Sequence, residues 1–125
     1  MLHYITIGAN DLDAAGKFYD PVMAAINYPR LSSDDGLGYG PAGAKPLFWV
    51  VRPFNKLPAN WGNGTMIAIT APSRAAVDTF HALGLANGGF DEGAPGIRGA
   101  GTDFYSCYIR DPAGNKLSAV FDKPV

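Results

Sequence analysis

The sequence predicts a single α+β domain built from two copies of one strand–helix–strand–strand–strand unit. Its 125 residues suffice for one compact domain and are few for two independent ones. Residues 4–11 (YITIGAND) align without gaps with residues 66–73 (MIAITAPS), and Phe18 aligns with Phe80, at the same offset of 62 residues. Such a duplication is typical of a pseudo-symmetric fold whose site lies between the copies.

The first copy opens with a strand over residues 2–9, and Asn10 or Asp11 is the expected N-cap of the helix that follows. Apolar residues then recur at spacings of three and four, which indicates an amphipathic helix. Pro21 interrupts this pattern and predicts a kink or a frayed turn.

Three further strands complete the first copy. Residues 31–39 are expected to form two short strands around the turn at residues 34–36, and residues 45–53 form the strongest strand of this half. We therefore place module one at residues 1–54. A polar connector rich in glycine and proline follows at residues 55–64.

Module two, residues 65–125, repeats the pattern with a strand over residues 65–71 and a helix capped by Ser73 and ended by two glycines at 88 and 89. A hairpin closes the chain. Its strands span residues 104–109 and 116–122, and residues 111–115 (DPAGN) form the tight turn between them.

Bulk properties exclude several function classes. The formal net charge of −1 leaves no basic footprint for nucleic acid or a membrane surface. No apolar run is long enough to span a bilayer, and the start of the chain lacks the features of a signal peptide, so a cytoplasmic location is expected. Cys107, the single cysteine, can form no intrachain disulfide and is expected to be a half-buried packing residue.

Three segments carry a family resemblance: residues 1–28, residues 63–89 and residues 104–122, the last containing RDPAGNKL. Together they resemble the vicinal oxygen chelate superfamily, which includes glyoxalase I, bleomycin resistance proteins and extradiol dioxygenases. The resemblance covers nearly the whole chain. It implies two βαβββ modules whose mixed sheet curves around a cleft, helices on the convex side, and a homodimer.

Many members of that superfamily bind a divalent metal ion through His, Glu or Gln, His and Glu. The resemblance places these ligands at Tyr4, Phe48, Met66 and Ser118 of this sequence. None of the four suits a catalytic divalent ion, because neutral Tyr and Ser are weak ligands and Met prefers soft metals. His3 lies one residue early, which turns its side chain to the other face of the strand. We therefore expect no metal and no other cofactor.

Strand parity places one set of residues on the face opposite Ile5 and Ile7. The set comprises Tyr4, Thr6, Phe48, Val50, Arg52, Met66, Ala68, Thr70, Ser118, Val120 and Asp122. A cleft lined by these residues is largely apolar and suits a small aromatic or amphipathic organic ligand, bound in a dimer cleft without metal. Trp49 and Trp61 are further candidates for the ligand mouth or the dimer seam, and Trp61 is favoured because it lies in a loop.

Alternatives remain open at this point. A metal-independent lyase or isomerase could use Tyr4, His3 or Arg52 for acid–base chemistry. Arg52 and Asp122 end equivalent strands, and they are either a pair that orients a charged ligand group or ordinary surface residues. His81 is expected to be a solvated or capping side chain of the second helix.

Overall fold

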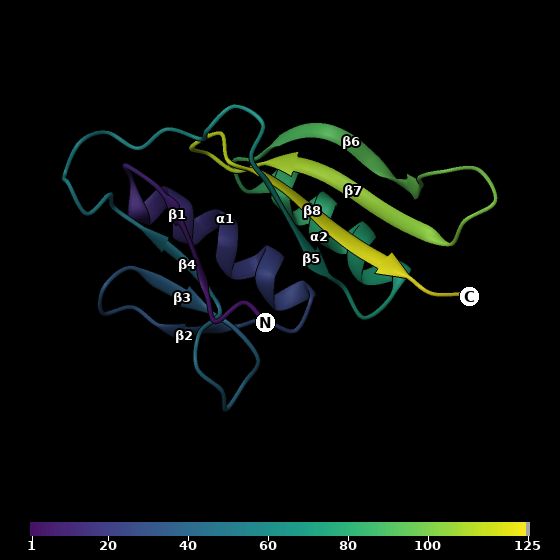
Figure 1. Ribbon diagram of the computed structural model, residues 1–125, viewed down its shortest axis with the longest axis horizontal. Helices are drawn as coiled ribbons and strands as arrows, with labels where there is room; N and C mark the ends of the chain where they lie inside the picture. The colour runs from purple at the N-terminus through teal and green to yellow at the C-terminus, as the bar shows by residue number, and fades with distance from the viewer. Residues whose placement is uncertain (125) are drawn as a thin grey trace.

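The protein folds as two βαβββ modules, as the sequence predicts, in a computed structural model that describes residues 1–124 (Figure 1). The elements are β1 (Ile5–Gly8), α1 (Leu12–Ala25), β2 (Arg30–Ser32), β3 (Leu37–Tyr39), β4 (Phe48–Val51), β5 (Met66–Thr70), α2 (Arg74–Ala86), β6 (Phe90–Ile97), β7 (Phe104–Arg110) and β8 (Lys116–Asp122). Sheet A has the strand order β1-β4-β3-β2, and sheet B has the order β5-β8-β7-β6. In each sheet the first strand pairs in parallel with the last strand of its module, and all other pairs are antiparallel.

Both helices begin where the sequence indicates. The Asp11 side chain accepts a hydrogen bond from the backbone N–H of Ala14, and the Ser73 hydroxyl accepts one from Ala76. The helix α1 includes Pro21 and continues to Ala25, so no turn is frayed there. The fully buried residues Val22 and Met23, which follow the proline, hold this part of the helix against the core.

The two helices pack on each other in the middle of the molecule, with sheet A on the left and sheet B on the right of Figure 1. Phe18 of α1 and Phe80 of α2, which the internal repeat aligned, are both fully buried. Gly84 lies at the contact, where an added Cβ would be 3.2 Å from the ring of Phe18 and would clash with Ile109. The repeat therefore supplies two equivalent aromatic residues to one shared core.

A buried hydrogen-bond network ties the β7–β8 turn to the first module. The Tyr19 hydroxyl donates to Asp111 Oδ2 at 2.6 Å, and the Asn115 side-chain amide donates to the same oxygen and to the carbonyl of Gly8, each at 2.9 Å. The backbone N–H groups of Ala113 and Asn115 donate to Asp111 Oδ1. The DPAGN turn therefore fixes how the end of β7 and the start of β8 lie against α1 and β1.

The register of sheet A corrects one part of the sequence analysis. Ile5 pairs with Phe48 and Ile7 with Val50, and paired residues of adjacent strands point to the same side of a sheet. Phe48 (3% exposed) and Val50 (0%) consequently pack in the core beneath α1, where the Phe48 ring lies 5.4 Å from the Tyr19 ring. The prediction that they lie on the open face is wrong by one residue, and Trp49 and Val51 take those positions.

The register of sheet B agrees with the predicted faces. Ala68 pairs with Ser118 and Thr70 with Val120, while the fully buried residues Leu117 and Ala119 face α2. Among residues 1–124 no helix has both the length and the hydropathy that crossing a membrane requires.

Candidate functional site

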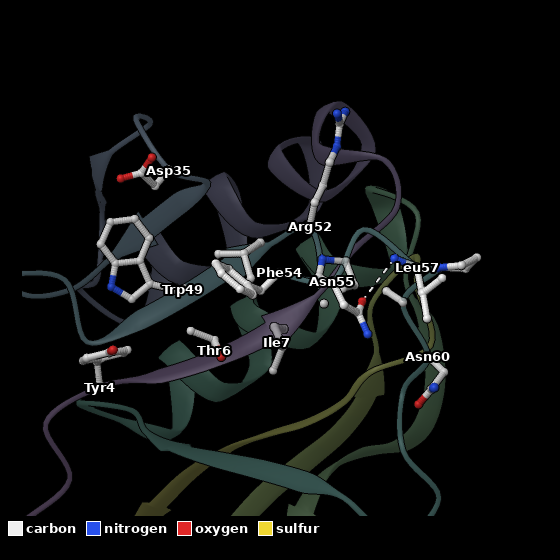
Figure 2. A pocket seen from close by; sticks show the side chains of 15 residues that line it. Tyr4, Thr6, Ile7, Asp35, Trp49, Arg52, Phe54, Asn55, Leu57 and Asn60 are labelled. Atoms are coloured by element: carbon white, nitrogen blue, oxygen red, sulfur yellow. Dashed lines mark hydrogen bonds between the residues drawn. The ribbon is translucent and has the colours of Figure 1, made fainter.

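A groove of about 1030 Å³ lies over the open face of sheet A. Its walls are formed by Tyr4, which precedes β1, by Thr6 of β1, by Trp49 and Val51 of β4, and by the segment after β4. The full lining is Tyr4, Thr6, Ile7, Gly8, Asp35, Trp49, Val51, Arg52, Pro53, Phe54, Asn55, Leu57, Pro58, Ala59 and Asn60. Figure 2 shows Tyr4 and Trp49 on neighbouring strands, with Phe54 beside them. Tyr4 is 55% exposed and Phe54 is completely exposed, so the groove offers aromatic surface that the chain itself leaves uncovered.

The segment after β4 is shaped by its own backbone and side chains. The Asn55 side chain accepts a hydrogen bond from the N–H of Leu57 at 3.1 Å, and the Asn10 side chain accepts one from Ala59 at 2.7 Å. An added Cβ at Gly8 would be only 2.9 Å from the side chain of Ala59. A glycine at this position therefore lets the segment lie directly on the end of β1 and close one side of the groove.

The polar side chains of the groove, besides the Tyr4 phenol, are Thr6, Asp35, Arg52, Asn55 and Asn60, and within residues 1–124 no hydrogen bond joins any two of them. Thr6 is on the floor, Asp35 precedes β3, and the guanidinium of Arg52 extends away from Tyr4 and Trp49 (Figure 2). Arg52 also borders a second hollow, of about 910 Å³, on the other side of the same segment. The groove is thus an aromatic surface with isolated polar contacts rather than a cluster of catalytic groups.

A smaller cavity of about 450 Å³ lies between the edges of the two sheets, where β1 faces β5. Tyr4 borders it from the first module and Met66 from the second, with Phe48 and Ile67 deeper inside. This cavity brings sequence-predicted site residues of both modules together. Tyr4 is shared by this cavity and the larger groove.

Three of the predicted ligand-binding residues, the buried Val50 together with Trp61 and Ser118, lie outside both cavities. Trp61 packs against the β7–β8 turn, with the Arg110 guanidinium 5.1 Å from its ring, and an added Cβ at Gly114 would be 2.7 Å from the indole. Arg110 is held in place by Glu92 at 2.5 Å and by the carbonyl of Gly114 at 2.8 Å. Ser118 is buried on the open face of sheet B.

His3 and Cys107 show no catalytic arrangement. His3 is exposed and touches Tyr4 edge-on, with ring centroids 5.7 Å apart, and within residues 1–124 no hydrogen bond orients its ring. Burial raises the pKa of the Cys107 thiol, and its sulfur lies against the carbonyl of Val77 in the core. A buried thiol with a raised pKa is a packing residue rather than a nucleophile. The prediction of a solvated or capping His81 is wrong, because its side chain is buried within α2 and bonded to Asp91 at 2.9 Å.

The donor set does not fit a catalytic divalent metal ion. In the structure, Trp49 and not Phe48 occupies the position of the first module that corresponds to Ser118. Ile5 pairs with Phe48 just as Ile67 pairs with Leu117, so the next residue of each strand, Trp49 or Ser118, points to the open face. The four positions that would hold the metal are thus Tyr4, Trp49, Met66 and Ser118, which offer one phenol, one indole, one thioether and one hydroxyl. Within residues 1–124 no three His, Cys, Asp or Glu side chains gather as a metal cluster. Hard divalent ions need carboxylate or imidazole donors, which this set lacks.

Sequence reasoning named Trp49 only as the less favoured tryptophan for the ligand mouth or dimer seam, and it missed the groove residues Phe54 and Leu57. Every residue from 47 to 51 is apolar, so alternation could not show which side chains face the core. Only the pairing with β1 settles the parity. A usable signal was the pair of large apolar residues at 54 and 57, at the boundary between module one and the connector rich in glycine and proline, since such residues have no core to join there.

The fold matches solved structures over nearly its whole length. A glyoxalase/bleomycin resistance protein from Albidiferax ferrireducens T118 is 36% identical, with 97% of each chain covered and a TM-score of 0.83. A glyoxalase-related enzyme from Fulvimarina pelagi is 16% identical, with 98% of this chain and 88% of that chain covered and a TM-score of 0.74. A lactoylglutathione lyase from Agrobacterium tumefaciens is 23% identical, with 96% and 92% covered and a TM-score of 0.61. No family model and no curated protein matches the sequence.

These findings define a paired βαβββ protein of the vicinal oxygen chelate type. At 36% identity over 97% of the chain, the protein belongs to the glyoxalase/bleomycin resistance protein/dioxygenase superfamily. The two more distant structures support the fold alone.

Proposed function

We propose that the protein binds a small aromatic or amphipathic organic molecule without a metal ion, in a cleft that a second copy of the chain completes. The groove over sheet A carries the proposal. Its volume of about 1030 Å³ is that of a small-molecule site, and its accessible aromatic side chains are Tyr4, Trp49 and Phe54. Aromatic rings stacked on a ligand add about 0.5–1.5 kcal/mol per pair beyond the apolar area buried.

Uncovered apolar side chains around the cavities support a dimer. Exposed fractions run from 39% for Leu47 to 102% for Phe54. The side chains in question are Leu2, Tyr4, Leu47, Phe54, Leu57 and Met66, and each borders the large groove or the smaller cavity. Exposed apolar surface concentrated at one place is typical of an interface, so we expect a particle of twice the chain mass in light scattering. Phe54→Ser should shift the particle toward the mass of one chain.

Calorimetric titration with neutral aromatic compounds, such as phenylacetamide and naphthol, tests the ligand class. Trp49→Leu should weaken binding by about tenfold or more, since 1.4 kcal/mol corresponds to a factor of ten. Trp61→Leu is the matched control, because Trp61 packs on Arg110 outside the groove. Protein treated with EDTA should bind as well as untreated protein. Equal losses in the two variants, or loss of binding with EDTA, would contradict the proposal.

The competing function is a metal-independent lyase or isomerase that uses Tyr4, His3 or Arg52. An acid–base catalyst requires a positioned partner for its side chain. His3 has none among residues 1–124, and Arg52 points away from Tyr4 and Trp49 (Figure 2). Binding without turnover is therefore the better-supported function. Conversion of a bound ligand that is lost in Tyr4→Phe would favour the enzyme instead.

A further inference from the structure

The open face of sheet B differs in chemistry from the groove on sheet A. Gly93 pairs with Tyr108, and Tyr108 with Ser118; Gly96 pairs with Ser106, and Ser106 with Val120. The alternate residues Cys107 and Ile109 are fully buried, and Cys107 contacts Val77 of α2. Ser106, Tyr108 and Ser118 consequently lie on the side of the sheet away from α2.

Two hydroxyl groups on this face lack partners. Ser106 is 0% exposed and Ser118 is 1% exposed, and neither Oγ atom makes a hydrogen bond within the described structure. A buried unsatisfied polar group costs about 1–3 kcal/mol, and such groups are uncommon in folded proteins. Because the two residues lie on adjacent strands, a single small group can accept hydrogen bonds from both.

Two cations border the same face. The Arg98 guanidinium carbon is 5.3 Å from the centroid of the Tyr108 ring, and Lys116 Nζ is 5.6 Å from it. Added Cβ atoms at Gly93 and Gly96 would lie 3.2 Å and 3.1 Å from the two terminal nitrogens of Arg98. Glycine at both positions therefore leaves the space that the guanidinium fills.

Neither cation has a carboxylate partner. Arg98 donates only to the carbonyl of Ala94, and the ion pairs among residues 1–124 involve other groups. Glu92 is occupied by Arg110, and Asp122 lies at the far end of β8, in register with Phe104. Among the described residues, no carboxylate pairs with Arg98 or Lys116, and Glu92, the acidic side chain beside this face, is bonded to Arg110.

We propose that the open face of sheet B is a binding site for the carboxylate or phosphoryl group of a small organic anion. Ser106 and Ser118 donate hydrogen bonds to the anionic oxygens, and Arg98 and Lys116 supply the charge. Both cations are half-buried and held mainly by the Tyr108 ring. A cation–π contact at a partly exposed site contributes about 0.5–1 kcal/mol, whereas a hydrogen bond to a charged group contributes about 1.5–3 kcal/mol, so turning toward an anion is favourable. Met66, Ala68 and Val120 share this face and offer apolar contact to the organic part.

Nuclear magnetic resonance titrations with phenylacetate, its neutral analogue phenylacetamide, and phenyl phosphate test this site. The backbone amides of Ser106, Tyr108 and Ser118 should shift with the anions, and phenylacetate should bind there about tenfold more tightly than phenylacetamide. The ratio between phenylacetate and phenyl phosphate shows whether carboxylate or phosphoryl is preferred. Inorganic phosphate should compete with both anions.

Arg98→Gln should bring the affinity for phenylacetate to within about twofold of that for phenylacetamide. Arg74→Gln is the matched control, because Arg74 lies 5.1 Å from the Tyr105 ring on the opposite face of β7. Ser118→Ala and Ser106→Ala should each raise the melting temperature without anion, since they remove an unsatisfied hydroxyl, yet weaken phenylacetate binding by about three- to tenfold.

Equal affinity for phenylacetate and phenylacetamide at these amides, or anion binding that Arg98→Gln leaves intact, overturns the proposal. So does the absence of any shift on β6–β8 with both anions. Trp49→Leu, which weakens binding in the groove on sheet A, should leave the amide shifts on sheet B unchanged. The proposal for sheet B can therefore fail while the proposal for sheet A holds, and the reverse.

Discussion

The hydrogen bond between Tyr19 and Asp111 allows a measured test of what holds the two modules together. Tyr19→Phe removes one hydroxyl and keeps the ring, which is fully buried against Phe18, Tyr39 and Phe48. The lost bond is 2.6 Å long, and its acceptor is 1% exposed. Asp111 Oδ2 would keep only the Asn115 amide as a partner.

The expected cost is large because water cannot replace the lost donor. A hydrogen bond to a charged group in the interior contributes about 1.5–3 kcal/mol. With an unfolding entropy of roughly 2.1 cal/mol/K per residue, that loss lowers the melting temperature of a chain of this size by roughly 6–11 °C. Calorimetric and urea unfolding of the variant and the parent protein would give both quantities.

Tyr105→Phe is the matched control. Its hydroxyl donates to Asp78 at the same distance of 2.6 Å, but that pair is exposed to solvent. The expected loss there is below about 0.5 kcal/mol. Equal losses in the two variants would refute the reasoning that burial, rather than bond length, sets the contribution of the network.

Three further outcomes are expected. Burial raises the pKa of Tyr19 and of Tyr39, so the folded protein keeps these protons to a higher pH than the unfolded chain does. The free energy of unfolding, measured with urea, should therefore be constant below about pH 10 and fall above it, less steeply in Tyr19→Phe. Phe48→Ala should cost about 3–5 kcal/mol in the same assay, whereas a cleft residue would cost far less. Gly84→Ala should destabilise the protein by about 1–3 kcal/mol by crowding Ile109, although alanine favours a helix by about 1 kcal/mol; a higher melting temperature would contradict the close packing of the helices.

The sequence is sufficient to predict the fold because the repeat is preserved where packing demands it. The helices start 62 residues apart, at Leu12 and Arg74, each after a side chain that caps it. The hairpin around the DPAGN turn forms where the turn residues indicate, and its Asp and Asn do more than turn the chain, since they also bind α1 and β1. That second role depends on contacts 92 and 107 residues away in the sequence, which local patterns cannot show.

The parts that could not be predicted share a physical cause. The strand β6 covers Phe90–Ile97 but contains four small or cyclic residues in succession and two shifts of register, so no alternation marks it. In β4 the opposite problem arises, because side chains on both faces are apolar and either parity satisfies the pattern. Aligning β4 with β8 by sequence then made Phe48 the equivalent of Ser118, although the registers of the two sheets show that the equivalent residue is Trp49.

The two modules are alike on their buried faces and different on their open faces. Ile5 and Ile67, Phe18 and Phe80 occupy equivalent places because each must fill a core against a helix. No such demand acts on the open faces, where Trp49 in one module corresponds to Ser118 in the other. Neither of these residues improves packing, since Trp49 is left half exposed and the Ser118 hydroxyl has no hydrogen-bond partner within the described residues. Residues that cost stability without serving the core are best explained by a ligand, and their chemistry indicates an aromatic contact on sheet A and an anionic contact on sheet B.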